Sequence, residues 1–315
     1  MRQPHETLRD RTHLSQAHTE LRGLFTLRQK WNTHGRHTAT ALGIAIAVLT
    51  VPVTVCGVEL KKETIQAFDR HVASVEARLA PRHRGEKFLW SDQASQRHQK
   101  LMQGAIAVEP AVDKGTVTIK GGLIHDFIGA AFIPGGTLTD ALRVTQDYKR
   151  HKEIYPEVAD AQIRSRQGND FIVYMRIVKT KFFLSDVLNT DQDIRFVSLD
   201  ANRAYSKSYS TRITEVADPG SAKERELPVG NDRGLLWRLN VYWFFEERDH
   251  GVYIECEAIT LTRDVPMGGG RLFAPIVQSV PAESLRGTLE QTRKAIAAQV
   301  NLNPAVQIPR IVPSR

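Results

Sequence analysis

The stretch LLWRLNVYWFFEERDHGVYIECEAITLTR, residues 235–263, holds two runs of alternating side chains separated by a turn at 248–251. One set of alternate positions in the first run is uniformly apolar and comprises Trp237, Leu239, Val241, Trp243 and Phe245. Successive side chains of a strand point to opposite faces of a sheet, so this set predicts a buried face. The other set mixes aromatic, amide and charged residues, which predicts a face that water tolerates.

The turn at 248–251 also predicts the register of the hairpin. Trp243 is then expected opposite Cys256, and Phe245 opposite Ile254. Large aromatic side chains of one strand therefore face smaller side chains of the next. A single helix packed on such a surface is expected to leave a cavity.

The same register places Glu255 and Glu257 on the other face of the sheet. Two carboxylates one strand repeat apart resemble an acid–base pair, yet a position on the outer face favours solvated side chains. Cys256 falls on the buried face and has no histidine near it in sequence. This favours a small buried residue over a nucleophile.

Residues 1–57 predict a removable export signal. Residues 1–38 carry seven Lys and Arg against three Asp and Glu, and 39–55 then run for seventeen residues without a charge. Such a run is short for a membrane span and typical of the apolar core of a signal peptide. The chain is therefore expected to be exported, to the periplasm or outside the cell. A membrane anchor at 39–55 and lipidation of Cys56 stay open as alternatives.

Removal of residues 1–57 changes the charge and the cysteine content. Of the 43 Lys and Arg and the 35 Asp and Glu, 36 and 32 remain, so the net charge falls from +8 to +4. Opposite charges are interspersed along the chain, which argues against a nucleic-acid-binding surface. Cys256 is the single remaining cysteine, so no intramolecular disulfide is expected.

The remaining chain divides into a helical prefix at 58–115, a main domain at 116–299 and a loose tail at 300–315. Within the prefix, 59–80 places apolar residues at helical spacing, and a second short helix is expected near 93–103. Both helices are expected to pack on the main domain. A helical dimerisation arm is the secondary alternative.

The main domain predicts long antiparallel strands followed by one long helix. After the strand-rich segment 116–134, strands are expected near 158–166, 170–178, 181–197, 203–216, 235–247 and 252–263. Val280-Pro281 is expected to open the last helix, because proline suits the first helical turn. This order predicts an α+β fold in which about six to seven antiparallel strands bend around the last helix.

The stretch AFIPGGTLTDALRVTQDYKRHKEIYP, residues 131–156, raises the question of a phosphate-binding loop. Gly135-Gly136 is not followed by the Gly-Lys-Ser/Thr that such a loop requires, so we expect a strand-to-helix corner with Thr137 as the helix cap. The histidines after residue 57 are scattered and have no cysteine partner, which gives metal binding little support. No cofactor and no catalytic residue are assigned.

Two stretches and the long strands between them resemble the START-like superfamily, also called the polyketide cyclase/SRPBCC or helix-grip fold. They are FIPGGTLTDALRVTQDYKRHKEIYPEVADAQI at 132–163 and VPAESLRGTLEQTRKAI at 280–296. The resemblance covers about 120–298. It implies a strand, two short helices and a six-stranded antiparallel sheet that curls around a long C-terminal helix.

RAYSKSYSTRITEV at 203–216 and the stretch at 235–264 further resemble an uncharacterised, exported bacterial branch of that superfamily. The superfamily implies a hydrophobic cavity between sheet and final helix, used for lipid-like or aromatic ligands and only sometimes for catalysis. It has no shared catalytic motif that could be carried over to this chain.

The predicted ligand-binding wall comprises Trp237, Leu239, Val241, Trp243, Phe245, Cys256, Leu285, Leu289, Met175 and Tyr209. The strand at 203–214 contributes either polar anchors, such as Ser208 and Tyr209, or an exposed ladder of side chains. The glycine-rich loop at 263–275 is expected at the mouth of the cavity, as a gate or as a plain connection.

The leading hypothesis is binding or transfer of a hydrophobic small molecule or lipid outside the cytoplasm. Transient membrane contact stays open, nucleic acid is not expected as a partner, and the oligomeric state is unknown. The alternative is a cyclase/aromatase-like or hydrolase-like enzyme that uses polar residues of the same cavity, such as Arg212 with a carboxylate. A third hypothesis is a scaffold whose interior is filled by aromatic side chains.

Overall fold

The computed structural model describes residues 58–83, 87–181, 184–264 and 270–302. All of them lie in one compact unit, Thr54–Arg315. The predicted export signal at 1–57 lies outside the described residues, as do 265–269 of the glycine-rich loop.

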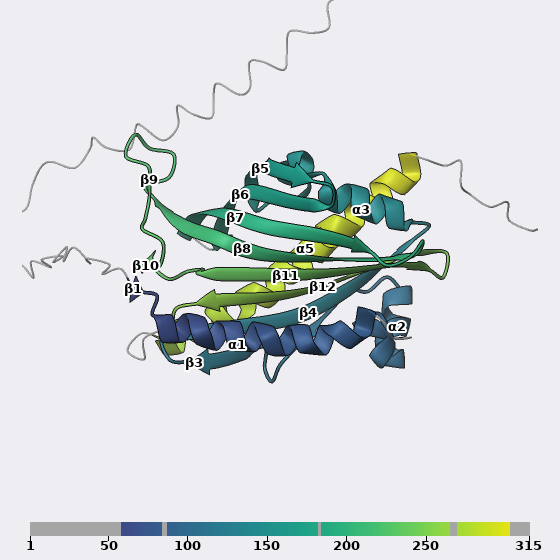
Figure 1. Cartoon of the computed structure of the whole chain (residues 1–315), viewed down its shortest axis with the longest axis horizontal. Coiled ribbons are helices and arrows are strands. Elements are labelled where there is room, and N and C mark those ends of the chain that lie inside the picture. The colour runs from purple at the N-terminus through teal and green to yellow at the C-terminus, as the bar shows by residue number, and fades with distance from the viewer. Residues whose placement is uncertain (1–57, 84–86, 182–183, 265–269, 303–315) are drawn as a thin grey trace, which may run out of the picture. The chain divides into compact units, whose positions relative to one another are not determined.

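The described part of the chain contains a ten-stranded antiparallel sheet (Figure 1). The strand order along its main path is β2-β4-β12-β11-β8-β7-β6-β5, with β3 paired to β4 and β9 paired to β8. The strands are β2 (Ala107–Pro110), β3 (Thr116–Ile119), β4 (Gly122–Pro134), β5 (Val158–Gln167), β6 (Asp170–Lys181), β7 (Leu184–Ser198), β8 (Arg203–Ala217), β9 (Arg225–Glu226), β11 (Arg238–Arg248) and β12 (Gly251–Thr262). The predicted long strands are present, and the higher strand count comes from the short β2, β3 and β9. A separate two-residue pairing joins β1 (Val58–Glu59) to β10 (Asn231–Asp232).

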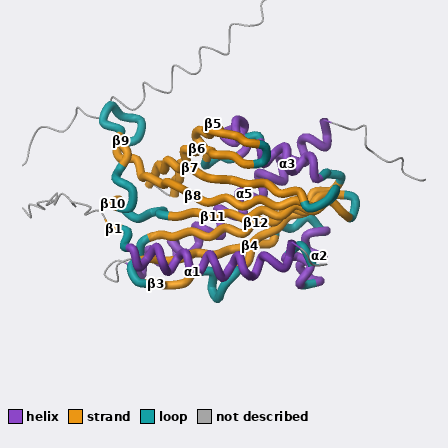
Figure 2. The backbone as a smooth tube through the Cα atoms, viewed as in Figure 1, coloured by secondary structure: helices purple, strands orange, loops and turns teal. Residues whose placement is uncertain are grey.

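Helices lie on both faces of the sheet (Figures 1 and 2). They are α1 (Lys62–Leu79), α2 (Ser95–Met102), α3 (Leu138–Gln146), α4 (His151–Ile154) and α5 (Gly270–Leu302), with short 3-10 turns at Ala80–His83, Trp90–Gln93 and Tyr148–Arg150. We call the side that packs on Leu285 and Leu289 of α5 the α5 face, and the side that packs on Phe68 of α1 the α1 face.

The β11–β12 hairpin has the predicted register. Trp243 lies opposite Cys256, and Phe245 lies opposite Ile254. His250 and Asp249 adopt positive φ angles of 56° and 54° in the turn, a conformation that asparagine, aspartate and histidine accept more readily than other non-glycine residues. The alternation of side chains therefore continues without a slip across both strands.

The corner at 131–156 is structural, as predicted. β4 ends at Pro134, and Gly135 follows with φ 71°, which glycine adopts without steric cost. Thr137 caps α3: its hydroxyl accepts a hydrogen bond from the Asp140 backbone N–H at 3.1 Å. The Asp140 carboxylate accepts from the Thr137 backbone N–H at 3.2 Å and completes a capping box.

The last helix begins earlier than predicted. α5 starts at Gly270, so Pro281 lies in its interior and not in its first turn. Proline removes one backbone hydrogen bond from a helix without forbidding it. Packing of α5 against β4, β2, β12 and α3 favours the continued helix.

The prediction of a solvated outer face is wrong. Tyr242 and Phe244 are 1% exposed, and Glu255 and Glu257 are fully buried. The prefix covers this face with α1, whose Phe68 joins Tyr242 and Phe244 in one apolar cluster. The sheet therefore separates two cores, and both sets of alternating side chains are buried or half-buried.

Candidate ligand-binding site

Most residues of the predicted wall lie together on the α5 face. Phe245, Cys256, Leu285 and Leu289 are buried in the apolar cluster of this face. Half-buried members of the wall pack against that cluster, namely Met175, Val241 and Trp243. Leu239 is also half-buried and pairs with Thr260 on the same face.

Helix α5 is attached to the sheet at both edges. Its main neighbours are β4, β2 and β12, at the edge where the short β2 lies. At the other edge, Lys179 of β6 donates to Ser284 of α5 and to Glu157, the latter at 2.6 Å. Tyr155 and Thr292 of α5 share a hydrogen bond of 2.9 Å between their hydroxyls. The α5 face is therefore bridged by the helix from β4 to β6.

Trp243 lies beside small side chains at the centre of this face. Its indole stacks on the Phe245 ring, with centroids 5.8 Å apart and planes inclined by 6°. Its ladder partners are Cys256 on β12 and Ser206 on β8. Trp243 is half-buried, whereas the neighbouring Phe245 is completely buried.

Four polar side chains are buried among these apolar ones. Thr190 and Gln192 come from β7, and Ser206 and Ser208 come from β8. Ser208 donates a hydrogen bond of 2.5 Å to Gln192 Oε1, whereas Gln192 Nε2 has no partner among the residues that the structure describes. The sequence indicated Ser208 as a polar anchor but missed Gln192, because its register is visible only once β7 and β8 are paired.

Two residues of the predicted wall are on the opposite face, which corrects the prediction. Trp237 belongs to the α1-face cluster, and its indole N–H donates to Asp232 Oδ1 at 2.9 Å. The alternation fails there because β11 begins only at Arg238. Tyr209 also packs on the α1 face, where its hydroxyl donates to Glu76 of α1.

Three ionisable residues of the α5 face, His125, Tyr155 and Cys256, keep their neutral forms near neutral pH. Burial lowers the pKa of His125 to about 4, and its ring contacts the hydroxyls of Thr116 and Thr262 at 3.1 and 3.2 Å. Burial also raises the pKa of Tyr155 to about 12 and raises that of the Cys256 thiol. A protonated thiol is a poor nucleophile, so Cys256 packs as a small apolar residue.

Arg212 does not enter the candidate site. Its guanidinium is 40% exposed and pairs with Glu226 and with Asp191, at 3.8 Å from the latter. Arg212 and its carboxylate partners, the pair expected for an enzyme, therefore lie away from the α5 face. Among the described residues, no group of three or more His, Cys, Asp or Glu is arranged to hold a metal ion.

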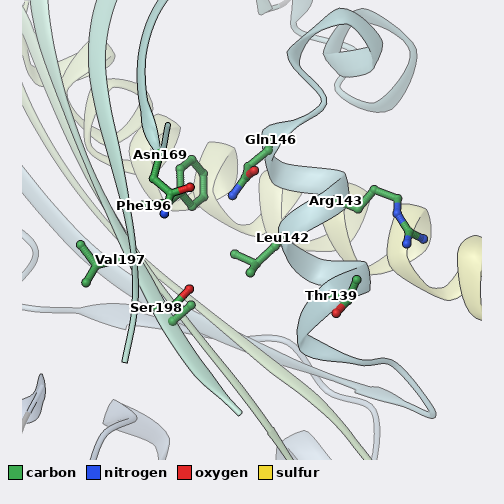
Figure 3. A pocket seen from close by; sticks show the side chains of 9 residues that line it. Thr139, Leu142, Arg143, Gln146, Asn169, Phe196, Val197 and Ser198 are labelled. Carbon is green, nitrogen blue, oxygen red and sulfur yellow. The ribbon is translucent and has the colours of Figure 1, made fainter. Parts of the chain in front are cut away.

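A pocket of about 350 Å³ opens between α3 and the ends of β7 and β8 (Figure 3). Leu142 and Gln146 of α3 point into it from one side, and Phe196 and Ser198 of β7 line the other. Phe196 also belongs to the apolar cluster of the α5 face. The pocket thus reaches the same core from the α3 end. A smaller pocket of about 80 Å³ lies between α3, α4 and α5.

The α1 face holds a buried ionic cluster that the sequence analysis missed. Arg78 pairs with Glu257 at 2.5 Å, and Arg82 pairs with Glu255. The remaining contact joins His71 Nε2 and Asp126 Oδ2 at 2.9 Å. Positions 71, 78 and 82 lie on the inner side of α1 and the turn after it. This spacing of basic residues at helical intervals was the signal in the sequence that could have indicated the cluster.

Burial is the main cause that sets the ionisation of this cluster. Burial first and the nearby Asp126 carboxylate second raise the pKa of Glu257 to about 7, against the opposing effect of Arg78. Burial also raises the pKa of Glu255, and the opposing effect of Arg82 only partly offsets this rise. One buried carboxyl of this face therefore titrates near neutral pH.

The long antiparallel sheet, the two short helices after β4 and the bridging C-terminal helix form the helix-grip arrangement that the sequence resemblance implied. The prefix helix α1 adds a second covering layer to the sheet. No family model and no curated protein match the chain.

Solved structures similar to this chain include lipid-transfer and aromatase proteins. A STAR-related lipid transfer protein fragment from Xanthomonas axonopodis is 13% identical over 59% of this chain and 99% of its own, with a TM-score of 0.37. Human STARD10 is 10% identical over 68% of this chain and 83% of its own, with a TM-score of 0.38. The Zhui aromatase/cyclase from Streptomyces sp. R1128 is 9% identical over 59% and 99%, with a TM-score of 0.39.

No helix in the described ranges has both the length and the apolarity needed to cross a membrane. The predicted apolar run at 39–55 lies outside those ranges.

Proposed function

We propose that this protein binds or transfers a hydrophobic small molecule or lipid between its sheet and helix α5, outside the cytoplasm. The observation that carries the proposal is Trp243. It is half-buried on a face whose other aromatic residues, such as Phe245 and Phe171, are buried. Aromatic rings that keep accessible surface inside an apolar layer are suited to contact an apolar ligand.

The neighbours of Trp243 support the same proposal. Met175 and Val241 are half-buried on this face, and methionine adapts its shape to different apolar partners. The buried Gln192 and Ser208 add polar groups that could orient a ligand. An apolar surface with a few convergent polar groups is the usual composition of a small-molecule site.

Trp243 and Trp237, which lie on opposite faces of the sheet, supply a matched test. A brominated fatty acid quenches indole fluorescence only on contact, so we expect saturable quenching that Trp243→Phe removes and Trp237→Phe retains. Quenching that persists in Trp243→Phe, or is absent from the wild-type protein, contradicts binding at this site. Extraction of the purified protein with organic solvent, followed by mass spectrometry, then identifies any ligand carried from the host.

The location outside the cytoplasm rests on the sequence of residues 1–57 and has its own test. We expect the protein isolated from its host to begin after Gly57 and to be found in the exported fraction. An intact N-terminus in the membrane fraction would instead support the anchor at 39–55.

A further inference from the structure

Gln192 is a polar residue in a place where an apolar one would fit. It lies on β7 opposite Val173 of β6, and Ile194 follows it on the same face. Only 1% of the Gln192 surface is exposed. One end of its amide is bound by Ser208, and the other end, Nε2, has no partner in the described part of the chain.

An unpaired amide N–H inside an apolar layer is unfavourable, because it has lost its hydrogen bonds to water. A leucine at this position would avoid that cost. Ser208 holds Oε1 at 2.5 Å and thereby fixes the orientation of the amide. Nε2 is left as an oriented donor on the face that carries Trp243.

The group that this donor would bind is neutral. Lys179 lies on the same face of β6, six residues beyond the ladder partner Val173, or about 20 Å along the strand, and it is engaged by Glu157. Arg166 of β5 lies over the Phe171 ring, 4.7 Å from its centroid, but it is exposed and donates to the Gly168 carbonyl. Neither cation is therefore buried beside Gln192 to hold a carboxylate. A carbonyl oxygen satisfies one amide N–H without a charge.

We propose that Gln192 is the anchor of the bound hydrophobe, and that its Nε2 donates a hydrogen bond to a neutral carbonyl oxygen of the ligand. The ligand class is thus an apolar ketone or ester, with its carbonyl at Gln192 and its apolar part against Trp243. Ser208 acts as a positioning residue. This inference rests on the proposed function and adds the chemistry of the polar end.

Two probe molecules of the same shape test the anchor by calorimetric titration of the full chain. 2-Acetylnaphthalene has the carbonyl, and 2-isopropenylnaphthalene has a CH2 group in place of its oxygen. We expect Gln192→Leu to weaken binding of the ketone by about three- to tenfold, the effect of one lost hydrogen bond. Binding of the hydrocarbon stays at the wild-type value and shows that the variant is folded.

Further variants separate the anchor from a structural role. Gln192→Met keeps the length of the side chain but loses the N–H donor, so it also weakens the ketone selectively. Gln162→Leu makes the same change as the first variant at an exposed position of β5 and alters neither affinity. The pair methyl heptanoate and n-decane repeats the comparison for an acyl chain and tells an ester from an aromatic ketone.

The outcomes distinguish the two proposals. If neither pair binds to the wild-type protein, both the anchor and the proposed function fail. If the probes bind but Gln192→Leu weakens ketone and hydrocarbon equally, or weakens neither, the anchor fails and the proposed function stands.

Discussion

At the scale of single residues, burial changes the chemical character of side chains that look ordinary in the sequence. Glu257 is next to Cys256 on a strand, yet the two point to opposite cores. Both have a raised pKa because both have lost water. If either side chain were exposed to water, its pKa would return to the ordinary value. The raised pKa values therefore depend on the helices that cover the two faces as much as on the residues themselves.

Glu257 gives a prediction for the pH dependence of stability. Its folded pKa of about 7 exceeds the ordinary value of 4.5, so the folded protein holds a proton that the unfolded chain releases between these pH values. The contribution of Glu257 to the free energy of unfolding is therefore full at low pH and falls, by on the order of 3 kcal/mol, as pH rises to 7.

Glu257→Gln cannot titrate, so its free energy of unfolding should improve relative to wild type as pH rises from 5 to 8. Urea unfolding at several pH values measures this difference. His125 and His151, whose pKa values burial lowers to about 4, titrate alike in both proteins. The exposed Glu153→Gln is the control, and a Glu257→Gln difference that stays constant with pH would contradict the prediction.

At the scale of elements, α1 and the turn after it are attached to the sheet by charges as well as by apolar contacts. The Arg82 guanidinium lies 4.1 Å from the centroid of the Phe244 ring and donates to the Phe88 carbonyl at 2.9 Å. It also neutralises Glu255, whose second oxygen accepts from the Trp90 backbone N–H at 2.6 Å. Arg82 therefore joins the end of the prefix helix to β12.

Arg82→Met should be strongly destabilising, because it leaves the Glu255 carboxylate buried without its cation. The expected loss is about 3–5 kcal/mol in urea unfolding. Arg82→Met combined with Glu255→Gln should recover part of this loss, since no uncompensated charge remains. Arg150→Met, at an exposed ion pair with Glu153, should have little effect. A double variant no more stable than Arg82→Met alone would show that packing dominates over charge.

At the scale of the whole described unit, one sheet serves two cores. The α5-face core contains the candidate site, and the α1-face core contains the ionic cluster. Neighbouring residues of each strand contribute to different cores, so neither core can be lost without disturbing the strands of the other. Cooperative unfolding of both layers follows from this arrangement.

Phe68→Asp tests that cooperativity. Phe68 of α1 is 2% exposed, and a carboxylate there disrupts the α1-face core at a cost of at least about 3 kcal/mol. With Trp31→Phe in both backgrounds, Trp243→Phe leaves Trp90 and Trp237 as reporters on the α1 face, and Trp237→Phe with Trp90→Phe leaves Trp243 on the α5 face. We expect coincident, equally lowered unfolding midpoints from the two backgrounds. Gln66→Asp at an exposed position of α1 is the control. Separate midpoints would mean that α1 detaches before the sheet unfolds.

Short sequence patterns correctly predicted several elements of this fold. The turn at 248–251 defined the β11–β12 register, and Thr137 with Asp140 defined the start of α3, because both depend on neighbours in the chain. The start of α5 was missed, because Pro281 has a local preference for a first turn that tertiary packing overrides.

The sequence by itself determined the succession of long strands along the chain, the hairpin register and the face on which Trp243 lies, since alternation and turn chemistry act over a few residues. Only the tertiary structure decided that Tyr209 and Trp237 lie under α1, that Glu255 and Glu257 are buried, and that Gln192 meets Ser208. These facts depend on which distant segments cover or pair with a strand. Such contacts form by burial of surface between segments far apart in the chain, and no short pattern records them.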